Sequence, residues 1–221
     1  MNEDMRTRLA KAVEPASTAL IVIDVQNDFC AKGGYYDKTG ADISGVQPAV
    51  ERLVGFIDQA RKAGVRVIFA RNNYDPVYVS EVQNARRKQV NWDLPYCRPG
   101  TWGWEFYRVA PLPDELIVTK HRYDAFYGTD LEVILRSNKV QSLLFAGVAT
   151  NVCVESTLRS AYMRDFYSTI VSDCCAGRNA RAHEATLDNV RFHFGLVASS
   201  DEIAAHWTDT ANQPRRAAGA A

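Results

Sequence analysis

The stretch "LLFAGVATNVCVESTLRSAYMRDF" (residues 143–166) joins an apolar run to a helical pattern through a turn of small residues. A continuous apolar run is typical of a strand that is covered on both faces of a parallel sheet. The turn places Cys153 almost at the start of the predicted helix. Strand, turn and helix in this order indicate an α/β fold, and Cys153 is either a packing residue or a nucleophile.

The same alternation of strand and helix extends along most of the chain. Besides the apolar run above (142–147), strands are predicted at 18–24, 65–71, 115–120, 167–173 and 196–200. Helical patterns cover 46–64, 129–140 and 178–195, with capping-box spacing at Thr129–Glu132 and at Ser199–Glu202 before a last short helix. This order predicts a three-layer α/β/α sandwich, doubly wound around a central parallel sheet. We expect one domain over residues 1–210 and a disordered tail over 211–221.

Composition argues for an ordinary globular protein. Lys plus Arg and Asp plus Glu number 26 each, so no basic field indicates nucleic acid or anionic lipid. The N-terminus lacks an apolar signal segment and no run has membrane-spanning length, which predicts a cytoplasmic protein without membrane contact. The five cysteines are irregularly spaced and odd in number, which argues against a disulfide framework. Cys174 and Cys175 are predicted to be small buried hydrophobic residues.

Residues 74–113 do not follow the alternation. This segment is rich in Trp, Tyr, Pro and Arg and shows weak periodicity. A long aromatic loop in a compact α/β domain usually belongs to a binding site or an oligomer contact. The sequence leaves open whether the loop is a lid or a subunit bridge, and whether Trp102 and Trp104 line a pocket or a subunit contact.

Polar and reactive side chains follow the predicted strands where parallel sheets bind ligands, at the carboxyl ends. They are Asp24, Asn72 with Asn73, Lys120 and Cys153. Each residue alone has a structural explanation: Asp24 could be a turn residue, Lys120 a surface residue and Cys153 a packing residue. Together, an acid, a base and a thiol at one sheet edge indicate a catalytic site.

The combination suits acyl transfer from an amide. A thiolate attacks carbonyl carbon, and a helix N-terminus and the ammonium of Lys120 would both favour that anion. Asp24 could accept the thiol proton and pass it to a departing nitrogen. The turn "GVATNVC" offers backbone N–H groups to an oxyanion. We therefore expect Cys153 to rest as a thiolate at neutral pH.

Three motifs, "ALIVIDVQNDF", "VTKHRYDAF" and "GVATNVCVESTLRSAYMRDF", resemble in order and spacing those of the isochorismatase-like cysteine hydrolases, over residues 17–205. The resemblance implies a catalytic triad of Asp24, Lys120 and Cys153. It also implies a cis peptide at Val148–Ala149, an oxyanion hole made by the N–H groups of Ala149 and Cys153, and a homo-oligomer, dimer or tetramer.

Within that family the motifs "GGYYD", "NNYD" and "KHRYDAF" are most similar to those of enzymes that hydrolyse ureidoacrylate. By this likeness Asn72, Tyr74 and Tyr123 would contact a ureido substrate, and Gln26 would lie near the acid and orient it. The loop after Val79 departs from those enzymes, so hydrolysis of biuret, triuret or an N-carbamoyl amino acid stays an alternative. Isochorismatases proper lack the cysteine and cleave an ether.

Nicotinamidases of the family bind a metal through an Asp and two His, whereas "ARNNYDPVY" holds no histidine. The resemblance therefore implies neither metal nor cofactor, and a small ureido or amide compound as the only ligand. Arg86, Arg87 and Arg98 could neutralise a substrate carboxylate or could be solvated surface charges.

The sequence fits other classes of protein less well. A catalytically silent binding or assembly protein would not need the acid, lysine and cysteine together. A dehalogenase-like phosphatase requires a second acid where Gln26 stands, and no G-x-G-x-x-G follows a strand as a dinucleotide site requires. A Cys–His pair with His121 is disfavoured because adjacent strand residues face opposite ways.

Overall fold

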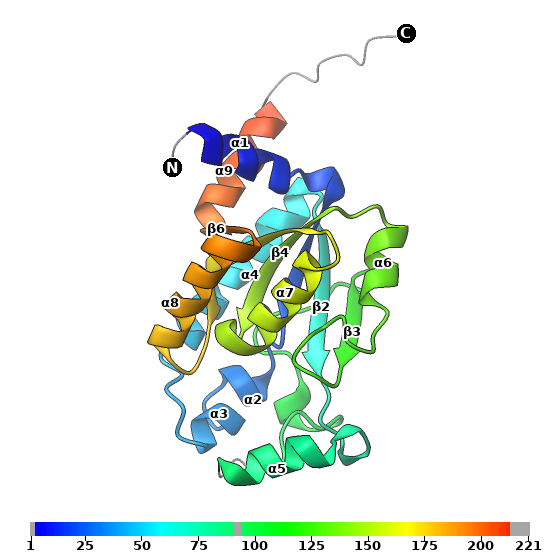
Figure 1. Ribbon diagram of the computed structural model, residues 1–221, viewed down its shortest axis with the longest axis vertical. Helices are drawn as coiled ribbons and strands as arrows, with labels where there is room; N and C mark the ends of the chain where they lie inside the picture. Colours follow the sequence, from blue (N-terminus) through cyan, green and yellow to red (C-terminus); the bar gives the residue numbers. More distant parts are fainter. Residues whose placement is uncertain (1–2, 91–93, 213–221) are drawn as a thin grey trace.

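The structure is a computed structural model that describes residues 3–90 and 94–212. Its centre is a six-stranded sheet in which every pairing is parallel, in the order β3-β2-β1-β4-β5-β6. The strands are β1 (Thr18–Ile23), β2 (Arg66–Asn72), β3 (Leu116–Lys120), β4 (Ser142–Val148), β5 (Tyr167–Ala176) and β6 (Leu196–Ala198). The predicted parallel α/β fold is confirmed (Figure 1).

Helices cover both faces of the sheet. The main helices are α1 (Glu3–Ala12), α4 (Val46–Ala63), α6 (Leu131–Ser137), α7 (Glu155–Tyr162), α8 (Ala180–Asn189) and α9 (Ser200–Asn212). One buried cluster joins α1, α4 and α9 to one face, and a second joins α6, α7 and α8 to the other. Residues 211–212 belong to α9, and the rest of the predicted disordered tail lies outside the described residues.

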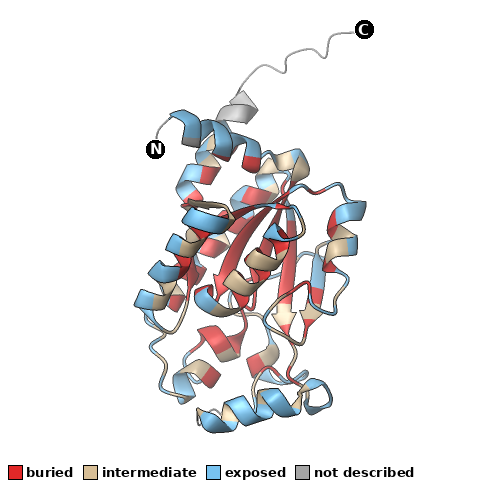
Figure 2. Cartoon of the chain, viewed as in Figure 1, coloured by how far each residue is buried: buried red, intermediate tan, exposed pale blue. Residues whose placement is uncertain are grey.

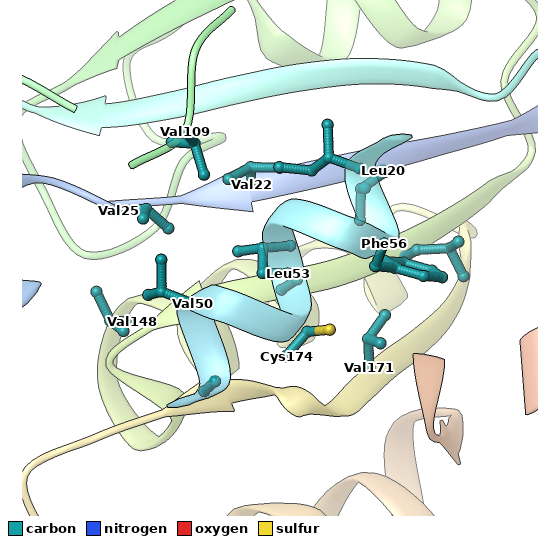
Figure 3. Packing of buried hydrophobic residues seen from close by; sticks show 14 of the residues in the cluster. Leu20, Val22, Val25, Val50, Leu53, Phe56, Val109, Val148, Val171 and Cys174 are labelled. Carbon is teal, nitrogen blue, oxygen red and sulfur yellow. The ribbon is translucent and has the colours of Figure 1, made fainter. Parts of the chain in front are cut away.

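Alternation within each strand builds the two cores. In β1, Leu20 and Val22 face the α4 side, whereas Ile21 and Ile23 face the α7 side. Both sets are fully buried, which explains why the strand is a continuous apolar run. Figure 3 shows Leu53 and Phe56 of α4 packed in the first cluster. Figure 2 shows the buried sheet between helices that expose their outer faces.

The sheet order creates a switch point between β1 and β4. From β1 the sheet extends through β2 to β3 on one side, and from β4 it extends through β5 to β6 on the other. The connections that follow β1 and β4 therefore run over opposite faces of the sheet. Such a point opens a crevice at the carboxyl ends of the strands. Two short helices, α2 (Asn27–Cys30) and α3 (Tyr35–Lys38), and the helix α5 (Glu81–Gln89) lie at that end (Figure 1).

The structure corrects the sequence analysis locally. The 74–113 segment contains a helix, α5, whose residues are exposed or half-buried. Its start carries a reciprocal capping box between Ser80 and Gln83, a signal that the sequence analysis missed. At α6 the N-cap is Asp130, so the predicted Thr129–Glu132 box is wrong. The predicted Ser199–Glu202 box is confirmed by reciprocal hydrogen bonds.

Candidate active site

Asp24 leaves the end of β1 in a left-handed backbone conformation, with φ 53°. Aspartate adopts this conformation more readily than most side chains. Its N–H donates to the carbonyl of Ala70 at 2.8 Å, which keeps the turn attached to β2. The carboxylate is fully buried, directly past the strand end, as the sequence predicts.

Lys120 is the last residue of β3 and reaches the acid from two strands away. Its Nζ lies 2.7 Å from Oδ2 of Asp24 and donates to the carbonyl of Arg122 at 3.0 Å. Both side chains of the ion pair are fully buried, which excludes the alternative that Lys120 marks the surface. A buried ammonium requires such a partner, because desolvation of an unpaired charge costs several kcal/mol, on the order of 5.

The ionisation of the pair follows from burial and mutual attraction. Burial raises the pKa of the Asp24 carboxyl, although the charge of Lys120 and the thiol of Cys153 oppose the shift. Burial favours the neutral amine of Lys120 and is the largest influence, but the charge and hydrogen bond of Asp24, together with the negative forms of Cys153 and Tyr74, outweigh it and raise the pKa of the ammonium. The pair therefore consists of a firmly protonated lysine beside a carboxylate that is more basic than an exposed aspartate.

Cys153 lies in a single π-helical turn, Thr150–Val154, that precedes α7. The expected resting thiolate is not what the site favours. Burial, and next the charge of Asp24, raise the pKa of the Cys153 thiol, and the charge of Lys120 offsets them only in part. The expectation of a thiolate rested on the ammonium of Lys120 and the helix N-terminus, and it left out the cost of burying a charged sulfur. The proton therefore rests on sulfur, next to the carboxylate that could accept it.

The turn before Cys153 is held close to β1. Gly147 has φ 122°, and a Cβ built there would lie 2.1 Å from the carbonyl oxygen of Ile23, so only glycine fits. The next peptide bond, Val148–Ala149, is cis, as the resemblance implies. Ala149 is the N-cap of the π-helical turn, and its carbonyl accepts from the N–H groups of Val152 and Val154. The oxyanion hole of Ala149 and Cys153 stays a prediction.

A cavity of about 520 Å³ opens beside Cys153. Cys153 is the triad residue that lines this cavity, whereas Asp24 and Lys120 are buried and absent from its lining. A ligand in the cavity would therefore meet the sulfur first. The aromatic lining residues are Phe29, Tyr35, Tyr36, Tyr74, Tyr96, Tyr123 and Tyr127.

Three of the four predicted substrate contacts line this cavity. Asn72 is buried at the end of β2, and its Oδ1 has no hydrogen-bond partner within the described part of the chain. Tyr74 is also buried, whereas Tyr123 is half-exposed. A buried acceptor without a donor beside a cavity is suited to bind an N–H group of a ligand.

The side-chain amide of Gln26 bonds to backbone groups of two segments. Its Oε1 accepts from the N–H of Asn72 at 2.8 Å, and its Nε2 donates to the carbonyls of Asn72 and Trp104 at 3.1 and 2.9 Å. Both amide hydrogens are used, and Gln26 is not among the lining residues. Gln26 therefore braces β2 against the aromatic segment, and its backbone N–H donates to the carbonyl of Asp24 at 2.7 Å. A contact with substrate and an orienting effect on the acid stay predictions.

Arginines from three segments line the cavity. Arg86 and Arg87 come from α5, while Arg98, the third arginine suggested by the sequence, is not among the lining residues. Arg122 and Arg178 also line it and were missed: Arg122 lies within the motif "KHRYDAF", where only Lys120 and Tyr123 were assigned roles, and Arg178 follows the predicted strand 167–173 at the start of a predicted helix. Among the residues described, Asp124 is the acidic lining residue, and its oxygens accept from the N–H of Phe126 and the hydroxyl of Ser160.

The remaining candidates lie away from the thiol. The ring of His121 stacks on Tyr78 at a centroid distance of 3.7 Å, and its Nδ1 lies 3.1 Å from the carbonyl oxygen of Asn73. It is not a lining residue, which argues against a Cys–His pair. Trp102 and Trp104 do not line the cavity either. Cys174 and Cys175 are buried, as predicted.

The described residues hold neither a cluster suited to a metal ion nor a helix suited to cross a membrane. Over residues 3–90 and 94–212, no group of three or more His, Cys, Asp or Glu side chains is placed to hold a metal ion. None of the helices in these ranges combines the length and the apolar character needed to cross a bilayer. The absence of a metal and of a cofactor stays a prediction.

Comparison with known proteins assigns the family. The isochorismatase domain model matches residues 18–202, so the chain belongs to the isochorismatase family. A curated relative, the ureidoacrylate amidohydrolase RutB of Methylobacterium radiotolerans, is 35% identical over 201 residues, covering 85% of this chain and 78% of the relative. The protein of the same name from Pseudomonas syringae pv. syringae is 33% identical, covering 86% of this chain and 84% of its own.

Solved structures agree with this assignment. A cysteine hydrolase from Pseudomonas syringae pv. phaseolicola superposes with a TM-score of 0.78 at 24% identity, covering 90% of this chain and 95% of its own, which supports the fold. The nicotinamidase PncA of Bacillus subtilis has a TM-score of 0.69 at 30% identity, covering 83% of this chain and 99% of its own. The family resemblance that the motifs indicate is thereby confirmed.

Proposed function

We propose that this protein is a cysteine amidohydrolase that cleaves a C–N bond of a linear ureido or amide compound, with ureidoacrylate as the first candidate. The observation that carries the proposal is the fully buried Lys120–Asp24 ion pair, 2.7 Å long, behind a cysteine that lines a cavity. The name shared by the curated relatives supports the ureido substrate.

The first chemical step transfers a proton and forms a bond. Asp24 takes the thiol proton as the sulfur of Cys153 attacks the carbonyl carbon of the substrate. The raised pKa of the Asp24 carboxyl makes it a better base for a thiol whose own pKa is raised. Lys120 keeps its proton and stabilises the carboxylate, so no free thiolate has to form before the substrate arrives.

The second step breaks the C–N bond. The oxyanion of the tetrahedral intermediate would accept from the N–H groups of Ala149 and Cys153, and loss of one such donor costs about a hundredfold or more in rate. Asp24 returns its proton to the departing nitrogen, and ammonia or an amine leaves. The resulting acyl- or carbamoyl-cysteine is hydrolysed by a water that Asp24 deprotonates, which restores the thiol.

Substrate recognition would use the unpartnered Oδ1 of Asn72 as an acceptor for a ureido N–H group. Tyr74 and Tyr123 would lie along the same planar group, since both line the cavity. Biuret, triuret and N-carbamoyl amino acids carry the same group and stay alternatives. The prediction of a cytoplasmic homo-oligomer, dimer or tetramer, accompanies this proposal.

The test is a panel of ammonia-release assays on ureidoacrylate, biuret, triuret, N-carbamoyl amino acids and nicotinamide. The proposal predicts release from ureido compounds that disappears in Cys153→Ala. Release from nicotinamide alone would assign another substrate class. Release from none of the compounds by the folded protein would indicate a silent binding protein.

A further inference from the structure

Asp28 connects two chain segments that carry opposite parts of one cavity wall. Its Oδ1 accepts from the N–H of Tyr35 at 3.1 Å, and its Oδ2 accepts from the N–H of Cys97 at 2.6 Å. Tyr35 begins α3, whereas Cys97 belongs to the aromatic segment more than sixty residues later. One carboxylate therefore fixes the separation of two segments that are distant in sequence.

The wall that these segments carry is a stack of three tyrosines, Tyr35, Tyr74 and Tyr96, which we call the tyrosine wall. The rings of Tyr35 and Tyr96 are stacked, with centroids 4.2 Å apart and an interplanar angle of 23°, whereas the ring of Tyr74 is tilted by 43° against Tyr96 at a centroid distance of 4.3 Å. All three line the cavity with Cys153. The Tyr74 N–H also donates to the carbonyl of Cys97 at 3.1 Å, so Tyr74 is attached to the same residue that Asp28 holds.

The aromatic segment packs closely against Asp28 and its neighbour. A Cβ built on Gly103 would lie 2.1 Å from Oδ2 of Asp28, so the glycine backbone packs directly against the carboxylate. Asn27, the preceding residue, donates its Nδ2 to the carbonyl of Trp102 at 2.8 Å. Hydrogen bonds to a carboxylate are stronger than those between neutral groups, which suits Asp28 to order the segment.

We infer that Asp28 is a positioning residue that holds the tyrosine wall against the substrate, and that residues 97–104 are a fixed support behind that wall and not a moving lid. The substrate part of this inference rests on the proposed function, because a planar ureido group stacks on a wall whose rings are held in place. Asp28 itself does not line the cavity, so it acts through Tyr35 and Tyr96.

The experiment compares Asp28→Asn with Asp37→Asn. The control removes an exposed carboxylate of α3, the helix that Tyr35 begins; this carboxylate accepts from the N–H of Gly33 at 2.8 Å. In Asp28→Asn the amide group faces one of the two N–H donors and cannot accept from it. We expect KM for the ureido substrate to rise about tenfold, equivalent to 1.4 kcal/mol, with kcat nearly unchanged. Asp37→Asn should match the wild type.

Two further readouts do not depend on turnover. Amide hydrogen exchange over residues 96–105 should be faster in Asp28→Asn and unchanged in Asp37→Asn. The rate at which iodoacetamide labels Cys153 should stay at the wild-type value, which also shows that the variant is folded. Gly103→Ala should mimic Asp28→Asn, and the two changes together should raise KM less than the product of their single effects, because they disturb one contact.

The outcomes separate this inference from the proposed function. Wild-type exchange and KM in Asp28→Asn would overturn the positioning role, and so would a parallel loss of kcat and labelling. If the wild type releases no ammonia from any ureido compound, the proposed function fails, while the exchange measurement still decides whether Asp28 fixes the wall.

Discussion

The Nζ of Lys120 and the Oδ2 of Asp24 lie 2.7 Å apart at the ends of β3 and β1, with both side chains fully buried. This ion pair connects the fold to the proposed chemistry, because β2 lies between the two strands and sets the reach of the lysine. Lys120 pairs with Asn72 in the β2–β3 register, so the lysine and the side chain of Asn72 lie at the same level of the sheet.

Lys120→Met should abolish activity and destabilise the fold. The change leaves a buried carboxylate without its counter-charge, which typically costs about 3–5 kcal/mol. The folded-state pKa of Asp24 should then rise further above its unfolded value, so part of the lost stability should return as pH falls below that pKa. Urea unfolding at several pH values measures this.

The double change Lys120→Met with Asp24→Asn is the matched control, because it removes both charges. It should be more stable at neutral pH than Lys120→Met alone. Equal stability of the two variants would show that Lys120 does not stabilise the fold through its ion pair with Asp24.

The pH dependence of kcat/KM should report a basic aspartate. The base must be ionised to accept the thiol proton, so activity is lost as pH falls through the pKa of Asp24. Burial raises that pKa, hence the acidic limb should lie above the ordinary carboxylate value of about 4. A limb at or below that value would contradict the assignment of Asp24 as base.

Alkylation of Cys153 should not titrate like a free thiol. Because burial and Asp24 raise the pKa of the Cys153 thiol, the labelling rate should still be rising past the ordinary cysteine pKa of about 8.5. A labelling rate that levels off below neutral pH would restore the resting thiolate that the sequence analysis expected.

Asn72→Leu should weaken substrate binding with little effect on the fold. The Oδ1 of Asn72 has no partner within the residues described, so no internal hydrogen bond to it is lost. Loss of one hydrogen bond to substrate should raise KM about tenfold, or roughly 1–1.5 kcal/mol. Steady-state kinetics and thermal melting measure the two effects, and an unchanged KM would remove Asn72 from the binding site.

Gln26→Met should destabilise the protein. The substitution leaves the N–H of Asn72 and two carbonyl groups without their partner, and a buried unsatisfied group costs about 1–3 kcal/mol. We expect a loss of about 3 kcal/mol in chemical denaturation. A variant of wild-type stability with altered substrate preference would instead support the substrate contact first predicted for Gln26.

The sheet and its reactive edge could be predicted because they rest on local signals. The apolar strands, Asp24, Lys120 and Cys153 all follow from strand ends and periodicity. The protonation of Cys153 could not be predicted, because desolvation depends on packing that no spacing reveals. Helix α5 was missed because it has no buried stripe, and Asp28 was missed because one of its partners, Cys97, lies 69 residues away in the sequence.

The most direct test of the proposed mechanism is intact-mass spectrometry of the enzyme quenched during turnover of a ureido substrate. We predict a covalent adduct with the mass of an acyl or carbamoyl group, located on Cys153 by peptide mapping and absent in Cys153→Ala. Turnover at the wild-type rate in Cys153→Ala, or an adduct on another residue, would contradict nucleophilic attack by this cysteine.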